Sequence, residues 1–338
     1  MIYIEHQSQD AAFWFGLERD LMTRQTLTDD VFLLWRVKPT VMIGRYQNIY
    51  DEIDLEFTKQ SGMQVTRRLT GGGAIYTDPG SFQFSFINSQ KEKQIDFSEF
   101  VAPVLSALRK IGLLVQMSGR NDLLIDGKKF CGNAQYRANG RVLHHGSILF
   151  DTDFARMARV LTPQKSDPEK LAKKGVQSVR ARVTNLKEYL DKTVNTDMSA
   201  KNDITADEFK NLLLSHILPK NADIRALNGE EISKIESMHA PLFISHDWVF
   251  NNKPAFKMTK SARFSGGKLE ICFNLKDYVI CDCQISGDFF LSGEIEQVAN
   301  SLNGCKYDKE SVRAALSPVL REQTFYQITI TDFLECLF

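Results

Sequence analysis

No stretch of the sequence is apolar over the roughly 20 residues that a helix needs to span a bilayer. The first residues, MIYIEHQSQD, lack the basic segment and long apolar run of a signal peptide. Excess charge is also missing, because 42 Lys and Arg balance 42 Asp and Glu, which argues against broad electrostatic binding to nucleic acid or to an anionic membrane. Internal repeats and low-complexity tracts are absent too. We therefore expect a cytoplasmic protein without a nucleic-acid or membrane partner, with a monomer as the default.

Cysteine is scarce, with six in 338 residues at scattered positions. In a chain of this length, that pattern indicates reduced thiols. Cys281 and Cys283 form a C-x-C pair that would suit a metal, but no second pair stands at ligand spacing. Both are therefore expected to be ordinary strand residues.

Hydrophobic residues make up 43% of the chain and include 23 phenylalanines, so a substantial core can form. Periodicity predicts helices at 10–24, 96–113, 153–174 and 205–219, and strands at 31–37, 40–46, 63–68, 74–77, 81–87, 113–118, 121–137 and 142–151. Asp10 is placed to cap the first helix, and Pro103 should kink the second helix or delay its start. A D-G pair at 126–127 predicts a turn.

A second unit is expected to begin near Trp248. The pattern there predicts strands at 248–264, 268–275 and 278–286, the last two joined across Lys276–Asp277, then helices near 292–302 and 308–321 and a last strand at 324–330. Strands followed by helices are typical of an α+β domain. Pro241 marks a break, so we place the boundary between domains at 1–245 and 246–338.

The segment TRRLTGGGAIYTDPG, at 66–80, sets two arginines shortly before three glycines. A hairpin turn would explain the glycines. The segment is not a Walker A loop, because no Lys-Ser or Lys-Thr follows, and a dinucleotide fingerprint fits poorly, because a strand follows. Glycines also let a backbone approach a ligand and point N–H groups at an anion. Strand alternation sends Arg67 and Arg68 to opposite faces, so one of them can face a phosphate-bearing ligand.

The segment GRNDLLIDGKKFCGNAQYR places two adjacent lysines, 128 and 129, after the D-G turn. Most lysines are solvated, but adjacent strand positions face opposite ways, so one of the two should point inward. An inward ammonium needs a negative partner, because burying a bare charge is costly. Asp122 or a bound carboxylate or phosphate would supply that partner.

In LHHGSILFD, the neighbouring residues His144 and His145 diverge on a strand and cannot share one metal ion. One structural histidine and one pocket histidine are expected. Cys131 near this strand suggests a thiol nucleophile, although its small neighbours in FCGNA favour packing.

These motifs occur together with KKGVQSVRARVTNL in an order and spacing that resemble the lipoate–protein ligase A family over roughly residues 1–190. From Trp248 onward, RFSGGKLEICF and ISGDFF resemble the accessory domain of that family. The resemblance implies an α+β biotin/lipoate ligase fold, with a mixed sheet, flanking helices and a small C-terminal α+β domain. It also implies ATP, Mg²⁺ and lipoate, with octanoate as a possible second acid. The implied reaction forms lipoyl-AMP and pyrophosphate, and then lipoylates a lysine on lipoyl domains of 2-oxoacid dehydrogenase complexes or on the glycine-cleavage H protein.

The resemblance also implies site residues. Lys129 matches the essential catalytic lysine, and Asp122 matches a residue near Mg²⁺. The implied ATP- and adenylate-binding residues are Arg68, Gly71, Gly72, Gly73, Ala74, Ile75, Tyr76, Asn121, Asp122, Lys129, Ser178 and Arg180. The implied lipoate-binding residues are Glu18, Arg45, Arg68, Thr77, Lys129, Gly132, Ala134, His145, Gly146 and Ser147.

Several positions depart from the family pattern, which usually has His at Thr77, Asn at Ser81 and Ser or Thr at Cys131. They leave the acyl chain preference open. The main alternative is a lipoyl or octanoyl transferase of the same fold that works without ATP, with Cys131 as its nucleophile. A non-catalytic protein that only binds lipoyl domains is a third hypothesis. A biotin ligase fits less well, because its GRGR-type segment is replaced by GRND.

Overall fold

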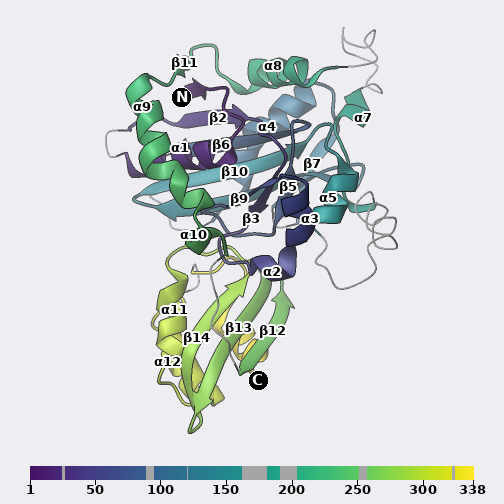
Figure 1. The fold of residues 1–338 in the computed structure, drawn as a ribbon. Helices are drawn as coiled ribbons and strands as arrows, with labels where there is room; N and C mark the ends of the chain where they lie inside the picture. Colours follow the sequence, from purple (N-terminus) through teal and green to yellow (C-terminus); the bar gives the residue numbers. More distant parts are fainter. Residues whose placement is uncertain are drawn as a thin grey trace.

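The computed structural model describes residues 1–24, 27–88, 95–119, 121–161, 181–190, 204–250, 257–321 and 324–338. Within these ranges, the largest sheet has eight strands in the order β11-β1-β2-β6-β10-β9-β8-β7 (Figure 1). Its strands are β1 Ile2–Glu5, β2 Val31–Trp35, β6 Ser81–Asn88, β7 Val115–Ser118, β8 Asp122–Ile125, β9 Lys128–Ala138, β10 Arg141–Leu149 and β11 Asp223–Ala226. β1 pairs in parallel with β2 and β11, and the other neighbouring strands pair antiparallel. The sheet is therefore mixed, as predicted.

Helices cover both faces of this sheet because its strands alternate apolar side chains between two clusters. On β2, Phe32 and Leu34 pack under α4 (Ser98–Lys110) and α8 (Ala206–Ile217), whereas Leu33 and Trp35 pack under α1. Helix α1 spans Ala11–Thr23 and begins, as predicted, at Asp10, whose side chain accepts a hydrogen bond from the Ala12 N–H. The segments α9 (Gly229–Lys234), η1 (Ile235–His239) and η2 (Ala240–Ile244) lie beside α1.

A second, three-stranded sheet holds the glycine segment. Its order is β4-β3-β5, with β4 at Gln64–Arg67, β3 at Thr40–Ile43 and β5 at Ile75–Thr77. β4 is parallel to β3, and β5 is antiparallel to it on the other side. Residues 69–74, which we call the glycine loop, therefore cross from one edge of this sheet to the other and do not form a hairpin. The helices α2 (Ile49–Glu52), α3 (Leu55–Gln60) and α5 (Phe154–Val160) lie nearby in Figure 1.

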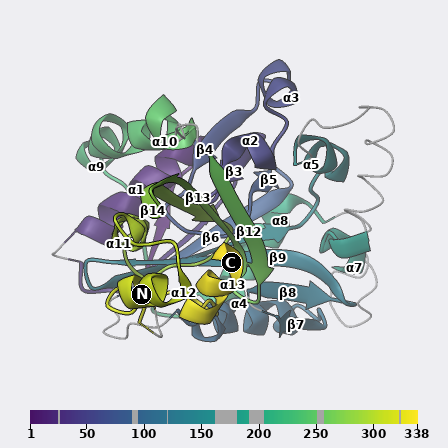
Figure 2. The same ribbon diagram turned by 90° about the horizontal axis from the view of Figure 1, so that it is seen from below.

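The C-terminal unit has its own core. Strands β12 (Met258–Phe264), β13 (Gly267–Lys276) and β14 (Val279–Gly287) form an antiparallel sheet covered by α11 (Ile295–Leu302), α12 (Lys309–Leu316) and α13 (Ile330–Leu337). This unit lies below the large sheet in Figure 1 and in front of it in Figure 2. Helix α10 (His246–Phe250) contacts β4 and η2, and places Val249 in the core beneath the small sheet of the first unit.

The two units meet at the glycine loop. The Gly72 N–H donates to the Phe289 carbonyl at 3.3 Å, and the Tyr46 ring stacks on the Phe289 ring with centroids 5.0 Å apart. Phe290 is fully buried among Phe97 and Ala134 of the first unit. A side chain at Gly71 would collide with the Phe289 carbonyl, so this approach requires glycine.

Several local predictions differ from the structure. Helix α4 begins at Ser98, well before Pro103, so the late start is not observed. The strand predicted at 248–264 contains α10 in its first part. The segment predicted as a strand at 324–330 consists of turns and one isolated bridge, and α13 begins at its last residue. The turn between β13 and β14 falls one residue later than predicted, at Asp277–Tyr278, where both φ angles are positive. The predicted helix at 153–174 is observed as α5, and its remainder after Leu161 lies outside the described residues.

None of the helices in the described ranges is both long and apolar enough to cross a membrane.

Candidate active site

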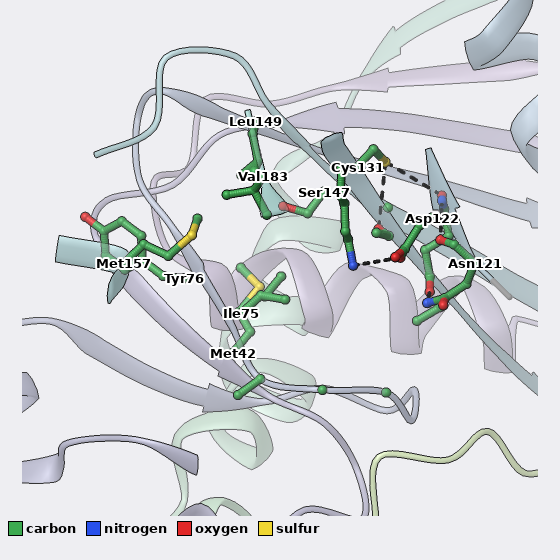
Figure 3. A pocket seen from close by; sticks show the side chains of 18 of the residues that line it. Met42, Ile75, Tyr76, Asn121, Asp122, Cys131, Ser147, Leu149, Met157 and Val183 are labelled. Atoms are coloured by element: carbon green, nitrogen blue, oxygen red, sulfur yellow. Dashed lines mark hydrogen bonds and ion pairs between the residues drawn. The ribbon is translucent and has the colours of Figure 1, made fainter. Parts of the chain in front are cut away.

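A pocket of about 710 Å³ opens between the two sheets of the first unit. Its walls come from the glycine loop, from β8, β9 and β10, and from the segment that follows residue 180. Among the residues predicted from the sequence, those that line it are Arg68, Gly72, Gly73, Ala74, Ile75, Tyr76, Asn121, Asp122, Lys129, Gly132, Ala134, His145, Gly146 and Ser147. In Figure 3, Asn121 and Asp122 stand on one side of the pocket, and Tyr76 and Met157 stand on the other.

Arg68 organises the glycine loop from inside the protein. Its guanidinium is buried and donates to the carbonyls of Gly71 (2.8 Å), Gly73 (2.7 Å) and Met42 (3.1 Å) and to the Thr70 hydroxyl (3.0 Å). Burial is the main cause that lowers the pKa of Arg68 to about 10, so the side chain stays charged at neutral pH. The loop carbonyls are thereby held inward.

The neighbouring arginine points the other way, as strand alternation predicts. Arg67 is equally buried, but its guanidinium donates to the carbonyls of Gly44, Gln47 and Val249. It thus ties the end of α10 to the loop after β3, and it is not part of the pocket lining.

Lys129 projects from the start of β9 into the pocket. Its Nζ lies 2.7 Å from Asp122 Oδ1 on the paired strand, the partner that the sequence suggested. A Cβ at Gly132 would lie 2.8 Å from Nζ, so glycine at this position leaves room for the lysine side chain to extend along β9. The site therefore offers an ammonium group close to one carboxylate, in the same cavity as the glycine loop.

His145 lines the pocket from β10. Its Nε2 lies 2.7 Å from the Thr70 hydroxyl, and its Nδ1 lies 3.3 Å from a carboxylate oxygen of Glu18. Glu18 is itself buried on α1, behind the wall of the pocket.

His144 faces the opposite side, so one histidine is structural and one lines the pocket. Its ring stacks on Phe100 with centroids 5.2 Å apart. Gln135 donates to His144 Nδ1, and the amide orientation of Gln135 is fixed because its oxygen accepts the Asp96 N–H. His144 Nε2 then donates to Asn133, so only the neutral ring satisfies both contacts. Burial, and next the neighbouring His145, hold the pKa of His144 well below its ordinary value.

This histidine should make the free energy of unfolding depend on pH. The unfolded chain binds a proton at His144 below about pH 6.5, whereas the native protein does not, so stability falls as the pH drops below that value. The loss is up to about 1.4 kcal/mol per pH unit. We expect His144→Gln to reduce the slope in denaturant unfolding measured between pH 7.5 and pH 5. His246→Gln is the control, because that side chain is exposed, and an equal change in both variants would contradict the assignment.

Cys131 lies beside Lys129 on β9 but is almost completely buried. Burial is the main cause that raises the pKa of Cys131 to about 12, so the thiol stays protonated at neutral pH. Its Sγ lies 3.8 Å from the Gly132 carbonyl oxygen, to which the thiol can donate. A protonated, buried thiol is a poor nucleophile.

Some predicted residues do not line the pocket. Gly71 faces the C-terminal unit, and Glu18 lies behind His145. Arg45 stacks its guanidinium 4.1 Å from the Trp248 ring centroid. Thr77 is buried and bonded to Ser81 and Gln83, so two residues that depart from the family pattern are paired with each other. Ser178 and Arg180 lie outside the described residues.

The sequence did not single out the apolar part of the lining. The pocket also contains Phe15, Trp35, Met42, Leu124, Leu149, Met157, Ala158, Leu161 and Val183. Their patterns match those of ordinary core residues, and no sequence signal separates a buried side chain that packs from one that borders a cavity. The pocket thus combines charged groups with a large apolar surface, as small-molecule sites commonly do.

A metal ion has few protein ligands here. Among the described residues, no group of three or more His, Cys, Asp or Glu side chains could hold one. Asp122 is the carboxylate that borders the pocket, with the Asn121 amide beside it. Mg²⁺ commonly binds through one or two carboxylates together with waters and substrate phosphates, so these two residues fit a nucleotide-bound Mg²⁺ but not a site made of protein alone.

The mixed sheet, the glycine loop and the lysine in the pocket define a protein with the architecture of the lipoate ligases. Residues 10–218 match the family described as "Lipoyl protein ligase A/B catalytic domain", and residues 253–337 match "Bacterial lipoate protein ligase C-terminus". The chain belongs to the lipoyl protein ligase A/B family.

Relatives and solved structures agree with this membership. The chain is 31% identical over 345 residues to lipoate-protein ligase LplJ of Bacillus subtilis, covering 100% of each chain. It is 34% identical over 315 residues to a lipoate–protein ligase of Streptococcus pyogenes, covering 92% and 90%. Its fold resembles that of LipL1 of P. falciparum in complex with lipoate, with a TM-score of 0.79, 24% identity and coverage of 99% and 97%. It also resembles a lipoate-protein ligase A bound with ATP, with a TM-score of 0.59, 24% identity and coverage of 74% and 98%.

Proposed function

We propose that this protein activates lipoate with ATP to give lipoyl-AMP and pyrophosphate, and then transfers the lipoyl group to a lysine of an acceptor domain. Its relatives at 31% and 34% identity are lipoate–protein ligases. The observation that carries the proposal is the position of Lys129, whose ammonium shares one cavity with the glycine loop and with His145 on β10.

The chemistry requires two anions to meet. A carboxylate oxygen of lipoate attacks the α-phosphorus of ATP, and the bond from that phosphorus to the pyrophosphate oxygen breaks. A fixed cation between the reactants offsets their repulsion and stabilises the charge that develops on the phosphoryl oxygens. Lys129 is placed to supply that cation. In the second step, the acceptor amine attacks the acyl carbon, an amide forms and AMP leaves.

The other lining residues take complementary parts. Apart from Gly72, whose N–H donates to the Phe289 carbonyl, the N–H groups of the glycine loop are suited to bind phosphate, because Arg68 holds the loop carbonyls inward. Asp122 and Asn121 would hold Mg²⁺ against the nucleotide, where the ion would neutralise phosphate charge. The apolar lining that includes Trp35, Leu149 and Met157 would exclude water from the acyl chain.

The acceptor is a protein lysine, and lipoyl domains of 2-oxoacid dehydrogenase complexes and the glycine-cleavage H protein are the candidates. A similar structure from Thermoplasma acidophilum, with a TM-score of 0.62, is a bipartite lipoate–protein ligase described with its E2 lipoyl domain. All six cysteines of the present chain are free thiols, which supports the proposal of a reducing compartment such as the cytoplasm.

Pyrophosphate release tests the proposal directly. The purified protein is mixed with ATP and Mg²⁺ and with lipoate, octanoate or biotin, with and without an apo-lipoyl domain. We expect release that depends on lipoate, and a mass gain of one lipoyl group on the acceptor. Acyl transfer from a lipoylated protein in the absence of ATP would instead identify a transferase. Binding to the lipoyl domain without either reaction would identify a non-catalytic binding protein.

Cys131→Ser separates the ligase from a transferase that uses a thioester. Because the thiol is buried and protonated, we expect the variant to keep most of the rate of pyrophosphate release and of acceptor lipoylation. Cys283→Ser is a matched control, since that thiol is also buried and burial raises the pKa of Cys283 to about 12, far from the pocket in the C-terminal unit. Complete loss of acyl transfer in the Cys131 variant alone would overturn the ligase mechanism.

A further inference from the structure

A chain of buried polar side chains runs behind the wall of the pocket. Arg68 Nε donates to Thr70 Oγ1 at 3.0 Å, Thr70 Oγ1 lies 2.7 Å from His145 Nε2, and His145 Nδ1 lies 3.3 Å from Glu18 Oε1. All four side chains are buried. Arg68 and His145 line the pocket, whereas Thr70 and Glu18 do not. Thr70 is therefore a hidden link between two groups that face the substrates.

The chemistry of the two ends points to one set of directions for these hydrogen bonds, in which every polar hydrogen has an acceptor. A guanidinium can only donate, and an ionised carboxylate can only accept. Because Thr70 accepts from Arg68, its own hydroxyl hydrogen is available to His145 Nε2. The His145 ring then carries its proton on Nδ1 and donates to Glu18. This neutral tautomer satisfies each donor and acceptor along the chain.

This series of hydrogen-bonded side chains continues to the acyl side of the pocket. The Ser85 hydroxyl donates to the same Glu18 oxygen at 2.5 Å, and Trp35 Nε1 donates to Ser85 Oγ at 3.3 Å. The Trp35 ring lines the pocket. The three side chains that line the pocket are thus connected to one another through Thr70, Glu18 and Ser85, which do not line it.

Arg68 connects these side chains to the backbone of the glycine loop, because its guanidinium also donates to the carbonyls of Gly71 and Gly73. We propose that Thr70 is a positioning residue that couples occupancy of the acyl subsite to the conformation of the nucleotide-binding glycine loop, an inference that rests on the proposed function. An acid bound against His145 and Trp35 restricts those rings and keeps the Thr70 hydroxyl aligned with Arg68. The glycine loop then needs less ordering when ATP binds.

Such coupling is reciprocal. If lipoate tightens binding of the nucleotide, the nucleotide must tighten binding of lipoate by the same factor, and typical factors are about 5 to 150. Removing the link should bring that factor close to one, even where both substrates still bind. A purely structural role for Thr70 would lower stability but would leave the factor unchanged.

The test measures lipoate affinity by calorimetry with and without α,β-methylene-ATP, which cannot release pyrophosphate. For the wild-type protein, we expect the nucleotide to tighten lipoate binding at least about fivefold. Thr70→Val removes the hydroxyl at nearly constant shape, and we expect the factor to fall close to one. Thr70→Ser should restore most of it. Thr66→Val is the matched control, because Thr66 is equally buried and its hydroxyl donates only to the Phe243 carbonyl.

The outcomes separate this inference from the proposed function. If the wild-type protein binds both ligands without mutual effect, or if Thr70→Val keeps the wild-type factor, the coupling role is wrong and the ligase assignment stands. If the wild-type protein binds neither lipoate nor the nucleotide, the proposed function itself fails.

A second measurement reads the wild-type protein itself and uses a variant only to assign the resonance. Nitrogen-15 NMR of the histidine rings in the wild-type protein reports the tautomer of His145, assigned by comparison with His145→Gln. We expect the proton on Nδ1 and a bare Nε2, as the direction of the chain requires. The opposite tautomer would overturn the inference, because Thr70 would then have no acceptor for its hydrogen.

Discussion

Replacing Lys129 with alanine is expected to reduce lipoate-dependent pyrophosphate release on the order of 10³-fold, the upper end of what removal of one preorganised donor costs. The Lys129 ammonium lies in the pocket beside Asp122, where it can stand between a carboxylate and the α-phosphate, and no other lysine lines the described part of the pocket. A rate of release equal to that of the wild type would refute the proposed mechanism.

The fold should survive this change. The Lys129 side chain is 37% exposed, and so is that of its partner Asp122. An ion pair with this exposure contributes within about 1 kcal/mol to stability. We therefore expect the variant to unfold at a temperature close to that of the wild type. A loss of activity would then reflect the chemical step and not a loss of folded protein.

Lys128→Ala is the matched control for Lys129→Ala. Lys128 is the preceding residue of β9, and it does not line the pocket. It should keep wild-type release, whereas Lys129→Arg should recover only part of it, because a planar guanidinium cannot replace a compact ammonium in a site bounded by Gly132. Equal loss in the Lys128 and Lys129 variants would point to a general charge effect.

Part of the polar lining of the pocket was predictable from local sequence patterns, and the rest was implied only by the family resemblance. Adjacent lysines and adjacent histidines on a strand point to opposite faces, so strand alternation separates the two members of each pair. The three glycines indicate a place where the backbone approaches another group closely. The roles of Thr70 and Ser85 were not predictable in this way, because the role of a buried hydroxyl depends on hydrogen-bond partners that come from distant parts of the sequence.

In the fold too, features set by neighbouring residues were predictable, whereas pairings between distant segments were not. β11 pairs in parallel with β1 from the other end of the first unit, and no local pattern indicates that partner. Residues 324–330 are rich in aromatic and β-branched side chains and resemble a strand, yet Phe325 makes only an isolated bridge to Leu291. The capping box of Thr329 and Asp332 was a local sign for α13 that the strand prediction overlooked.

Arg68→Ala should have the second large effect. It removes the four hydrogen bonds that a buried guanidinium makes to the glycine loop, Thr70 and β3, and it leaves the buried acceptors unpaired. Each unpaired group costs about 1–3 kcal/mol, so we expect a loss of at least about 3 kcal/mol in the free energy of unfolding. The released loop carbonyls should also weaken binding of α,β-methylene-ATP more than binding of lipoate.

A variant of the adjacent Arg67 separates the loss of stability from the loss of nucleotide affinity. Arg67 is as deeply buried and donates to five carbonyls, but these lie after β3 and at the end of α10 and not in the glycine loop. Arg67→Ala should therefore lose comparable stability while its folded fraction binds the nucleotide with nearly wild-type affinity. Calorimetry at a temperature where both variants are folded, checked by circular dichroism, makes the comparison. A similar loss of nucleotide affinity in the two variants, or an equal loss for lipoate and nucleotide in the Arg68 variant, would mean that the guanidinium supports the fold as a whole and does not set the glycine loop for phosphate.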